Sequence, residues 1–260
     1  MQRTEQVVTI PEALIEAVRR REVVLFAGSG ISLAAGLPSS QAFAAQLLRG
    51  LHESDPNYAV PVVGSAFASL AADFEVMHSR HELARQVRLL LEIPGTIAPT
   101  QAHIASVDLF PRIITTNYDE LFERAIAIRN SKQQTIVAPD CPSPTPDSFL
   151  LKLHGSYTIP ASLVITESDL ATFETSHKGL LAQVAALLAS KPVLVVGSSL
   201  RDPSVFRLFH VVDRRLPGYC LIPRSDPLTT MRLRSFGMDP IEGSIESFYR
   251  ALVEALHAGG

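Results

Sequence analysis

The sequence predicts an α/β fold in which a mostly parallel β-sheet carries helices on both faces. Short runs rich in Val, Ile and Leu alternate with longer segments of helical periodicity, which is the order expected of βαβ units. The runs are apolar at consecutive positions, as is typical of strands that are covered on both faces. The expected strands are residues 22–27, 112–116, 135–137, 149–153, 163–166, 192–197 and 219–222.

The longer segments space their apolar residues by three and four, which predicts helices that pack on the sheet. Pro11 and Pro203 stand at first helical positions, where a missing N–H is tolerated, and Ser244 is placed to cap the last helix. The expected helices are residues 11–20, 40–51, 66–91, 118–129, 167–190, 203–214 and 245–257.

A long helical stretch separates the first expected strand from the second. Its apolar stripe, which runs from Phe67 to Met77 at spacings of three and four, is typical of core packing rather than of a cofactor site. We therefore expect a helical insertion at about residues 40–110, within a single domain that takes in residues 1–260.

Composition excludes several kinds of partner. The chain has a net charge of −3 and 23 scattered basic residues, so we expect no direct nucleic-acid binding, which needs a basic stripe. Cys141 and Cys220 are too few for a disulfide framework or a four-thiolate zinc site, which favours a reducing compartment. No window approaches the roughly 18 apolar residues of a membrane span. We expect a soluble, cytoplasmic protein without a bound metal.

A glycine-rich turn follows the first expected strand. Ala27 runs directly into Gly28-Ser29-Gly30-Ile31-Ser32, where glycine allows close backbone approach and the start of the next helix attracts a phosphate. Ser32 can cap that helix or donate to a phosphate oxygen. Leu33 replaces the third glycine of the dehydrogenase fingerprint, which disfavours hydride transfer. The turn predicts a Rossmann-like pyrophosphate site, with a tight turn without ligand as the alternative.

Polar residues also follow three other expected strands. Asn117 and Asp119 follow the second, His154 with Gly155 the fourth, and residues 197–199 (Gly-Ser-Ser) the sixth. Each set also has an explanation without a ligand. Asn117 and Asp119 can cap a helix, His154 can be structural or solvated, and residues 197–199 can be a tight turn. Because ligands gather at the carboxyl ends of parallel strands, we expect these residues to share one crevice.

In this order the motifs resemble the sirtuin-like (SIR2-like) superfamily, and they are most similar to bacterial zinc-less members that hydrolyse NAD in antiviral defence. The motifs are Gly28-Ser29-Gly30-Ile31-Ser32, Gly36-Leu37-Pro38, Thr116-Asn117-Tyr118-Asp119, His154-Gly155 and Gly197-Ser198-Ser199-Leu200, followed by Asp202. Protein-deacylating sirtuins carry zinc-binding cysteines after the His-Gly pair, and residues 156–196 contain none. Ser39 and Ser40 also replace their Phe-Arg pair.

The resemblance implies an NAD+ glycohydrolase that releases nicotinamide and ADP-ribose, with NAD as substrate and no metal. The implied catalytic residues are Asn117, which positions ribose hydroxyls and water, His154, a general base, and Asp119, which binds the nicotinamide carboxamide. The implied dinucleotide-binding residues are Ala27, Gly28, Ser29, Gly30, Ser32, Pro38, Thr116, Gly197, Ser198, Ser199 and Asp202.

Two other functions use the same motifs. An NAD-dependent protein deacylase or ADP-ribosyltransferase breaks the same bond, but the missing cysteines count against it. A non-catalytic sensor of NAD or ADP-ribose would not need both Asn117 and His154. Because an enzyme that depletes NAD must stay silent until it is triggered, we expect control by homo-oligomerisation or by a separate defence protein, such as an Argonaute-type or translocase-type ATPase.

Overall fold

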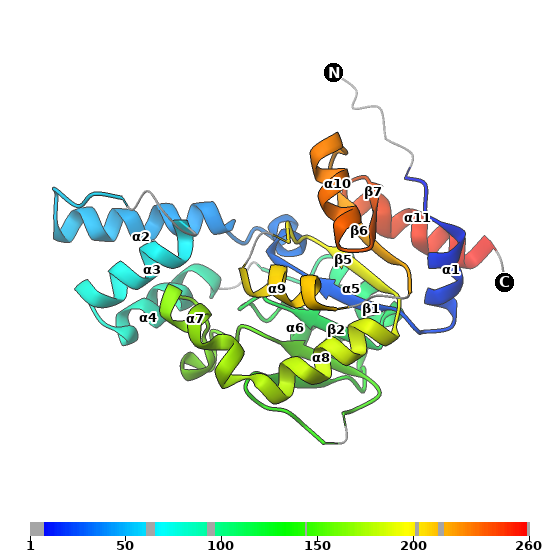
Figure 1. The fold of residues 1–260 in the computed structure, drawn as a ribbon, viewed down its shortest axis with the longest axis horizontal. Helices are drawn as coiled ribbons and strands as arrows, with labels where there is room; N and C mark the ends of the chain where they lie inside the picture. The colour runs from blue at the N-terminus through cyan, green and yellow to red at the C-terminus, as the bar shows by residue number, and fades with distance from the viewer. Residues whose placement is uncertain are drawn as a thin grey trace.

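The computed structural model describes residues 8–60, 66–92, 97–143, 145–200, 203–212 and 216–258. Its centre is a seven-stranded sheet with the order β3-β4-β2-β1-β5-β6-β7, in which all neighbouring strands are parallel (Figure 1). The predicted α/β class is confirmed. The strands are β1 Val24–Ala27, β2 Arg112–Thr115, β3 Gln134–Val137, β4 Phe149–Lys152, β5 Val193–Val196, β6 Gly218–Ile222 and β7 Met238–Glu242.

Helices lie in the connections between the strands, except for the loop that joins β3 to β4. The α-helices are α1 Glu12–Arg19, α2 Ser40–Ser54, α3 Ala66–Met77, α4 Arg80–Leu91, α5 Gln101–Leu109, α6 Leu121–Arg129, α7 Glu167–Ser176, α8 Lys178–Ser190, α9 Pro203–Val211, α10 Pro227–Ser235 and α11 Ile245–Ala258. Two 3₁₀ helices, η1 Ser29–Ala35 and η2 Pro160–Ser162, complete the set. In the part of the chain described, no helix has both the length and the apolarity that a bilayer crossing requires.

Both faces of the sheet are buried under helices. Leu25 and Ala27 of β1 join a core that includes residues of α1, α5, α6 and α11. Val24 and Phe26 point the other way, into a core that includes residues of α7, α8, α9 and α10. This explains why the strands are apolar at consecutive positions.

A third hydrophobic cluster lies beside the sheet. Helices α2, α3 and α4 form it around Leu47, Leu51 and Phe74, and Leu163 and Ile165 from the segment after β4 complete it. These helices gather with α7 at the end of the molecule opposite α1 and α11 (Figure 1). Helix α5, which also lies within the stretch at about residues 40–110, packs on the sheet core and not in this cluster.

The structure corrects several predicted elements. The predicted helices at 66–91 and 167–190 are each two helices; Ser79 caps α4 and interrupts the first. Residues 163–166 do not form the predicted strand, because their apolar side chains enter the helical cores and Thr166 caps α7. Helices α5 and α10 and strand β7 were not predicted. Strand β7 pairs only with β6 and contains Pro240, so it lacks the continuous apolar run of a central strand.

The chain order identifies the edge of the sheet where ligands bind in such folds. From β1 the chain passes to β2 on one side, and it later returns to β5 on the other side of β1. The sheet therefore changes winding direction between β1 and β5, and the crevice at the carboxyl ends of these strands is the usual ligand position.

Candidate active site at the carboxyl ends of four strands

Four adjacent strands bring the predicted motifs to one edge of the sheet. Strands β4, β2, β1 and β5 are neighbours and run parallel, so the segments that follow them all lie at the same edge. Thr115 of β2 pairs with Lys152 of β4, and Asn117 and His154 each lie two residues beyond this pair. The structure thus places the amide and the imidazole at the ends of neighbouring strands.

The two glycine turns, residues 28–30 and 197–199, pack directly against each other. The Gly30 amide donates to the Gly197 carbonyl (2.9 Å), and a Cβ on Gly28 would lie 2.7 Å from the same oxygen. Gly197 has φ +69°, and a Cβ there would overlap the Ile31 amide nitrogen. The close backbone approach predicted from these glycines therefore occurs between the two turns.

The helix that the sequence predicted after Gly28 is a 3₁₀ helix over residues 29–35. It ends at Gly36 with φ +92°, and half-buried Pro38 lies in the link to α2. Ser29 and Ser199 are exposed on the two glycine turns. The Gly30 amide is already engaged by the Gly197 carbonyl, so it is not available to a phosphate.

A buried polar cluster is centred on Ser32, two residues after the first glycine turn. Its hydroxyl donates to Asp119 Oδ2 (2.9 Å), accepts from Asn117 Nδ2 (3.2 Å) and faces His103 Nε2 (3.4 Å). A carboxylate only accepts, so the single O–H of Ser32 is directed to Asp119. The side-chain amide of Asn117 must therefore present its NH₂ group to Ser32. Asn117 Oδ1 is then left buried without a partner among the residues that the structure describes.

His103 was not predicted as a site residue. Its Nδ1 accepts from the Thr100 amide (3.2 Å), so the ring proton lies on Nε2 and faces Ser32. Burial lowers the pKa of His103 to about 4, although the Asp119 carboxylate acts in the opposite direction. The sequence signal was the Thr100-to-His103 capping box at the start of α5.

Asp119 serves both the local fold and the cluster. Its Oδ1 accepts from the Leu121 amide (3.0 Å), which explains why α6 begins at Leu121 and not at the predicted Tyr118. The Thr115 hydroxyl donates to the carbonyl of buried Ala27 (2.9 Å), and Thr116, the next residue, is half-buried. The ends of β1 and β2 are therefore joined at the site.

His154 lies in a tightly constrained turn. It is 3% exposed, and its ring makes an edge-to-face contact with Phe173 at 5.4 Å. Gly155 follows with φ +84°, and a Cβ there would overlap the carbonyl of Ser162. The backbone of this turn thus requires a glycine after His154.

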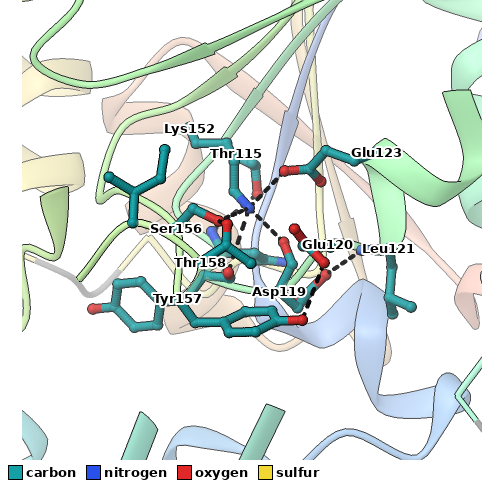
Figure 2. Close-up of polar contacts among 12 residues, drawn as sticks. Thr115, Asp119, Glu120, Leu121, Glu123, Lys152, Ser156, Tyr157 and Thr158 are labelled. Atoms are coloured by element: carbon teal, nitrogen blue, oxygen red, sulfur yellow. Dashed lines mark hydrogen bonds and ion pairs between the residues drawn. The ribbon is translucent and has the colours of Figure 1, made fainter. Parts of the chain in front are cut away.

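A fully buried lysine connects the segments that carry Asn117 and His154 (Figure 2). We call residues 116–120 the Asn117 loop and residues 153–157 the His154 loop. Lys152 Nζ donates to the Asp119 carbonyl (2.6 Å), Glu123 Oε1 (2.7 Å) and Ser156 Oγ (3.0 Å). Burial raises the pKa of Glu123, and the Lys152 ammonium opposes this shift. Sequence reasoning missed Lys152 because it ends an apolar run.

Two cavities lie away from this edge of the sheet. A cavity of about 270 Å³ is lined by residues of α2, α3 and α4, and one of about 330 Å³ includes residues that precede β5 and β6. Neither is lined by the predicted site residues. The predicted ligand residue Asp202 is outside the described residues. Within the described ranges, no three His, Cys, Asp or Glu side chains are grouped as metal ligands.

A family model for the SIR2-like domain matches residues 111–241, about half of the chain. The chain belongs to the SIR2-like family. The matched part of this SIR2-like chain runs from the start of β2 into β7, and it includes Asn117, Asp119, His154 and the second glycine turn.

Two curated relatives of this SIR2-like chain are named NAD(+) hydrolase ThsA. The protein from Enterococcus faecium is 25% identical over 223 residues, which cover 80% of this chain and 44% of the relative. The protein from Bacillus cereus (strain MSX-D12) is 27% identical over 121 residues, 43% of this chain and 25% of the relative. The chain thus matches less than half the length of either relative.

Solved structures show the same fold at lower identity. An NAD complex of a Sir2 homologue has a TM-score of 0.59 at 14% identity, covering 96% of this chain and 95% of the other. An ADP-ribose complex of a mutant Sir2 homologue has a TM-score of 0.61 at 17% identity, with 96% and 98% covered. These likenesses establish the Rossmann-like architecture of the SIR2-like chain.

Proposed function

We propose that this chain is an NAD+ hydrolase that breaks the nicotinamide–ribose bond and releases nicotinamide and ADP-ribose, within one NAD-binding domain. The observation that carries the proposal is the unpaired Oδ1 of Asn117 among described residues, two residues past β2 and beside the loop that bears His154. A buried acceptor without a partner is costly, so it suits a site completed by a ligand donor. The names of the two curated relatives support the same activity.

In the proposed reaction the nicotinamide–ribose C–N bond breaks, and its electron pair leaves with nicotinamide. The ribose gains oxocarbenium character, so catalysis requires orientation and a placed water more than a strong nucleophile. Asn117 Oδ1 accepts a hydrogen bond from a ribose hydroxyl or from this water. The water oxygen bonds to the ribose carbon, and His154 takes the released proton.

The remaining residues bind the dinucleotide. Asp119 uses one lone pair of each oxygen for Ser32 and Leu121, and the remaining lone pairs can accept the N–H of the nicotinamide carboxamide. The glycine turns face the pyrophosphate with Ser29 and Ser199. Ser32 is a buried organiser of Asn117 and Asp119 in this scheme, rather than a direct phosphate ligand.

The proposal extends to a role in antiviral defence, with activation by self-assembly or by a separate defence protein. Its support is the resemblance to zinc-less defence effectors and the harm that unregulated NAD loss would do. The relatives are also more than twice as long as their matched parts, which leaves room for regulation outside this region.

The deciding experiment incubates the purified protein with NAD+ and separates the products by chromatography. Equal amounts of nicotinamide and ADP-ribose are expected from the wild type and not from Asn117→Ala. Nicotinamide release with ADP-ribose attached to protein would indicate a transferase. Tight binding without release, whether alone, after concentration-driven assembly or in the presence of the proposed defence protein, would indicate a sensor.

A further inference from the structure

Lys152 occupies a position where an apolar side chain is expected. It is the last residue of β4, and Leu150, two residues earlier, points into the core that includes α6. The Lys152 side chain points to the same face and is fully buried. Because burial of an ammonium group is costly unless its protons are all used, a lysine here needs a specific reason.

The ammonium group uses its three protons on three different segments. Figure 2 shows the contacts: the Asp119 carbonyl in the Asn117 loop, the Glu123 carboxylate in α6, and the Ser156 hydroxyl in the His154 loop. The Tyr118 carbonyl lies near Nζ as well, at 3.4 Å. The side chain therefore spans both loops that carry the proposed catalytic groups.

We infer that Lys152 is a positioning residue that fixes the Asn117 loop against the His154 loop, an inference that rests on the proposed function. Asp119 is held at two points, with its carbonyl on Lys152 and its carboxylate on Ser32. Without the ammonium, the Asp119 carbonyl would be left unpaired in a buried position, and the backbone would rotate to satisfy it. That rotation moves Asn117, two residues earlier.

A backbone hydrogen bond reports directly on this arrangement. The Tyr157 amide of the His154 loop donates to the Tyr118 carbonyl of the Asn117 loop at 3.1 Å. If Lys152 holds the loops together, its removal exposes this amide to exchange with solvent. The hydrogen bonds of Lys152 Nζ go to the two loops and α6 and not to the glycine turns proposed to hold the pyrophosphate, so affinity for ADP-ribose should change far less than kcat.

The test replaces the ion pair as a unit, with Lys152→Met/Glu123→Leu, because removal of the lysine alone would strand a buried carboxylate. The matched control is Arg129→Met/Asp108→Asn, which removes an exposed ion pair between α6 and α5. Melting temperature, ADP-ribose Kd, kcat for nicotinamide release and exchange at the Tyr157 amide are measured for each. We expect kcat to fall by about a hundredfold in the first variant, with faster exchange and a much smaller change in Kd, and no effect in the control.

Ser156→Ala is a second variant in case the double replacement does not fold. It removes one acceptor of Lys152, and we expect kcat to fall by about tenfold with a much smaller change in Kd. Wild-type kcat in a folded Lys152 variant overturns the inference, whether or not amide exchange changes. A wild type that releases no nicotinamide, whether alone, after self-assembly or with the proposed defence protein, overturns the proposed function instead, and the Tyr157 exchange rate then decides whether Lys152 holds the loops.

Discussion

The side-chain amide of Asn117 donates to the hydroxyl of Ser32 at 3.2 Å, and this contact determines which way the amide faces. Ser32 uses its only O–H as the hydrogen-bond donor to Asp119, so toward Asn117 its oxygen must act as the acceptor. The carbonyl end of Asn117 is consequently directed away from Ser32, and the described residues offer it no donor. The cluster therefore leaves one buried acceptor free for the proposed ligand, and this makes the proposed role of Asn117 specific enough to test.

Asn117→Ala should lower kcat for nicotinamide release by at least about a hundredfold, because it removes the acceptor that orients the ribose or the water. The melting temperature should change little, since the lost contact is one hydrogen bond to Ser32. Asn57→Ala, at an exposed position after α2, is the control. Wild-type turnover in Asn117→Ala would remove this residue from the mechanism.

His154→Ala should reduce kcat by about a hundredfold to ten-thousandfold, the range expected when a general base is lost. The ring also packs on Phe173, so a melting curve must show that the variant remains folded at the assay temperature. The matched control is His81→Ala, because His81 is exposed on α4. Equal losses in the two variants would mean that the effect is not catalytic.

Ser32→Ala should destabilise the fold by about 1–3 kcal/mol, because buried groups on Asn117, Asp119 and His103 lose their shared partner. It should also lower kcat while leaving the ADP-ribose Kd nearly unchanged, since the hydroxyl is engaged within the protein. Ser29→Ala, on the exposed turn, should show the reverse pattern. Urea titration measures the unfolding free energy, and calorimetry measures the ADP-ribose Kd. A large loss of ADP-ribose affinity in Ser32→Ala would favour a direct phosphate contact.

The sequence was sufficient to predict what depends on regular patterns. Continuous apolar runs marked β1, β2, β4 and β5, and parallel strands necessarily bring their carboxyl ends to one edge. The sequence therefore predicted that Gly28, Asn117 and His154 lie at one edge of the sheet, as the strand order shows. The glycine spacing did not reveal that the two turns pack on each other, because that contact joins segments far apart in the chain.

The missed residues are those whose roles depend on tertiary contacts. In the sequence Lys152 is the end of an apolar run. Its contact with the Asp119 carbonyl depends on the pairing of β4 with β2, where Lys152 lies opposite Thr115. His103 was overlooked because α5 lacked a recognisable apolar stripe. Residues 163–166 resembled a strand by composition, but their apolar side chains contact helices instead of joining the sheet. Composition alone does not distinguish these two environments.

Gly197→Ala should cost more stability than Gly36→Ala, although both glycines have positive φ. At Gly36 an added Cβ meets nothing within 4 Å, so only backbone strain of about 1 kcal/mol is expected. At Gly197 the Cβ would also overlap the first glycine turn, which should raise the cost to about 3 kcal/mol or more. The urea unfolding midpoints of Gly197→Ala and Gly36→Ala are compared. Equal midpoints would show that the turns separate easily.

Stability should fall between about pH 6.5 and pH 4 because of His103. Burial lowers its folded-state pKa to about 4, so over this range the unfolded chain binds a proton that the folded chain does not. The sign follows directly: this contribution is complete above pH 6.5 and is lost as the pH falls, by on the order of 3 kcal/mol. His103→Gln keeps an N–H for Ser32 without a titrating ring, so its unfolding free energy should decline less steeply. Urea titrations at pH 7 and pH 4.5 compare the two proteins, with exposed His81→Gln as the control. Parallel pH profiles for wild type and His103→Gln would show that the imidazole is not held neutral by the fold.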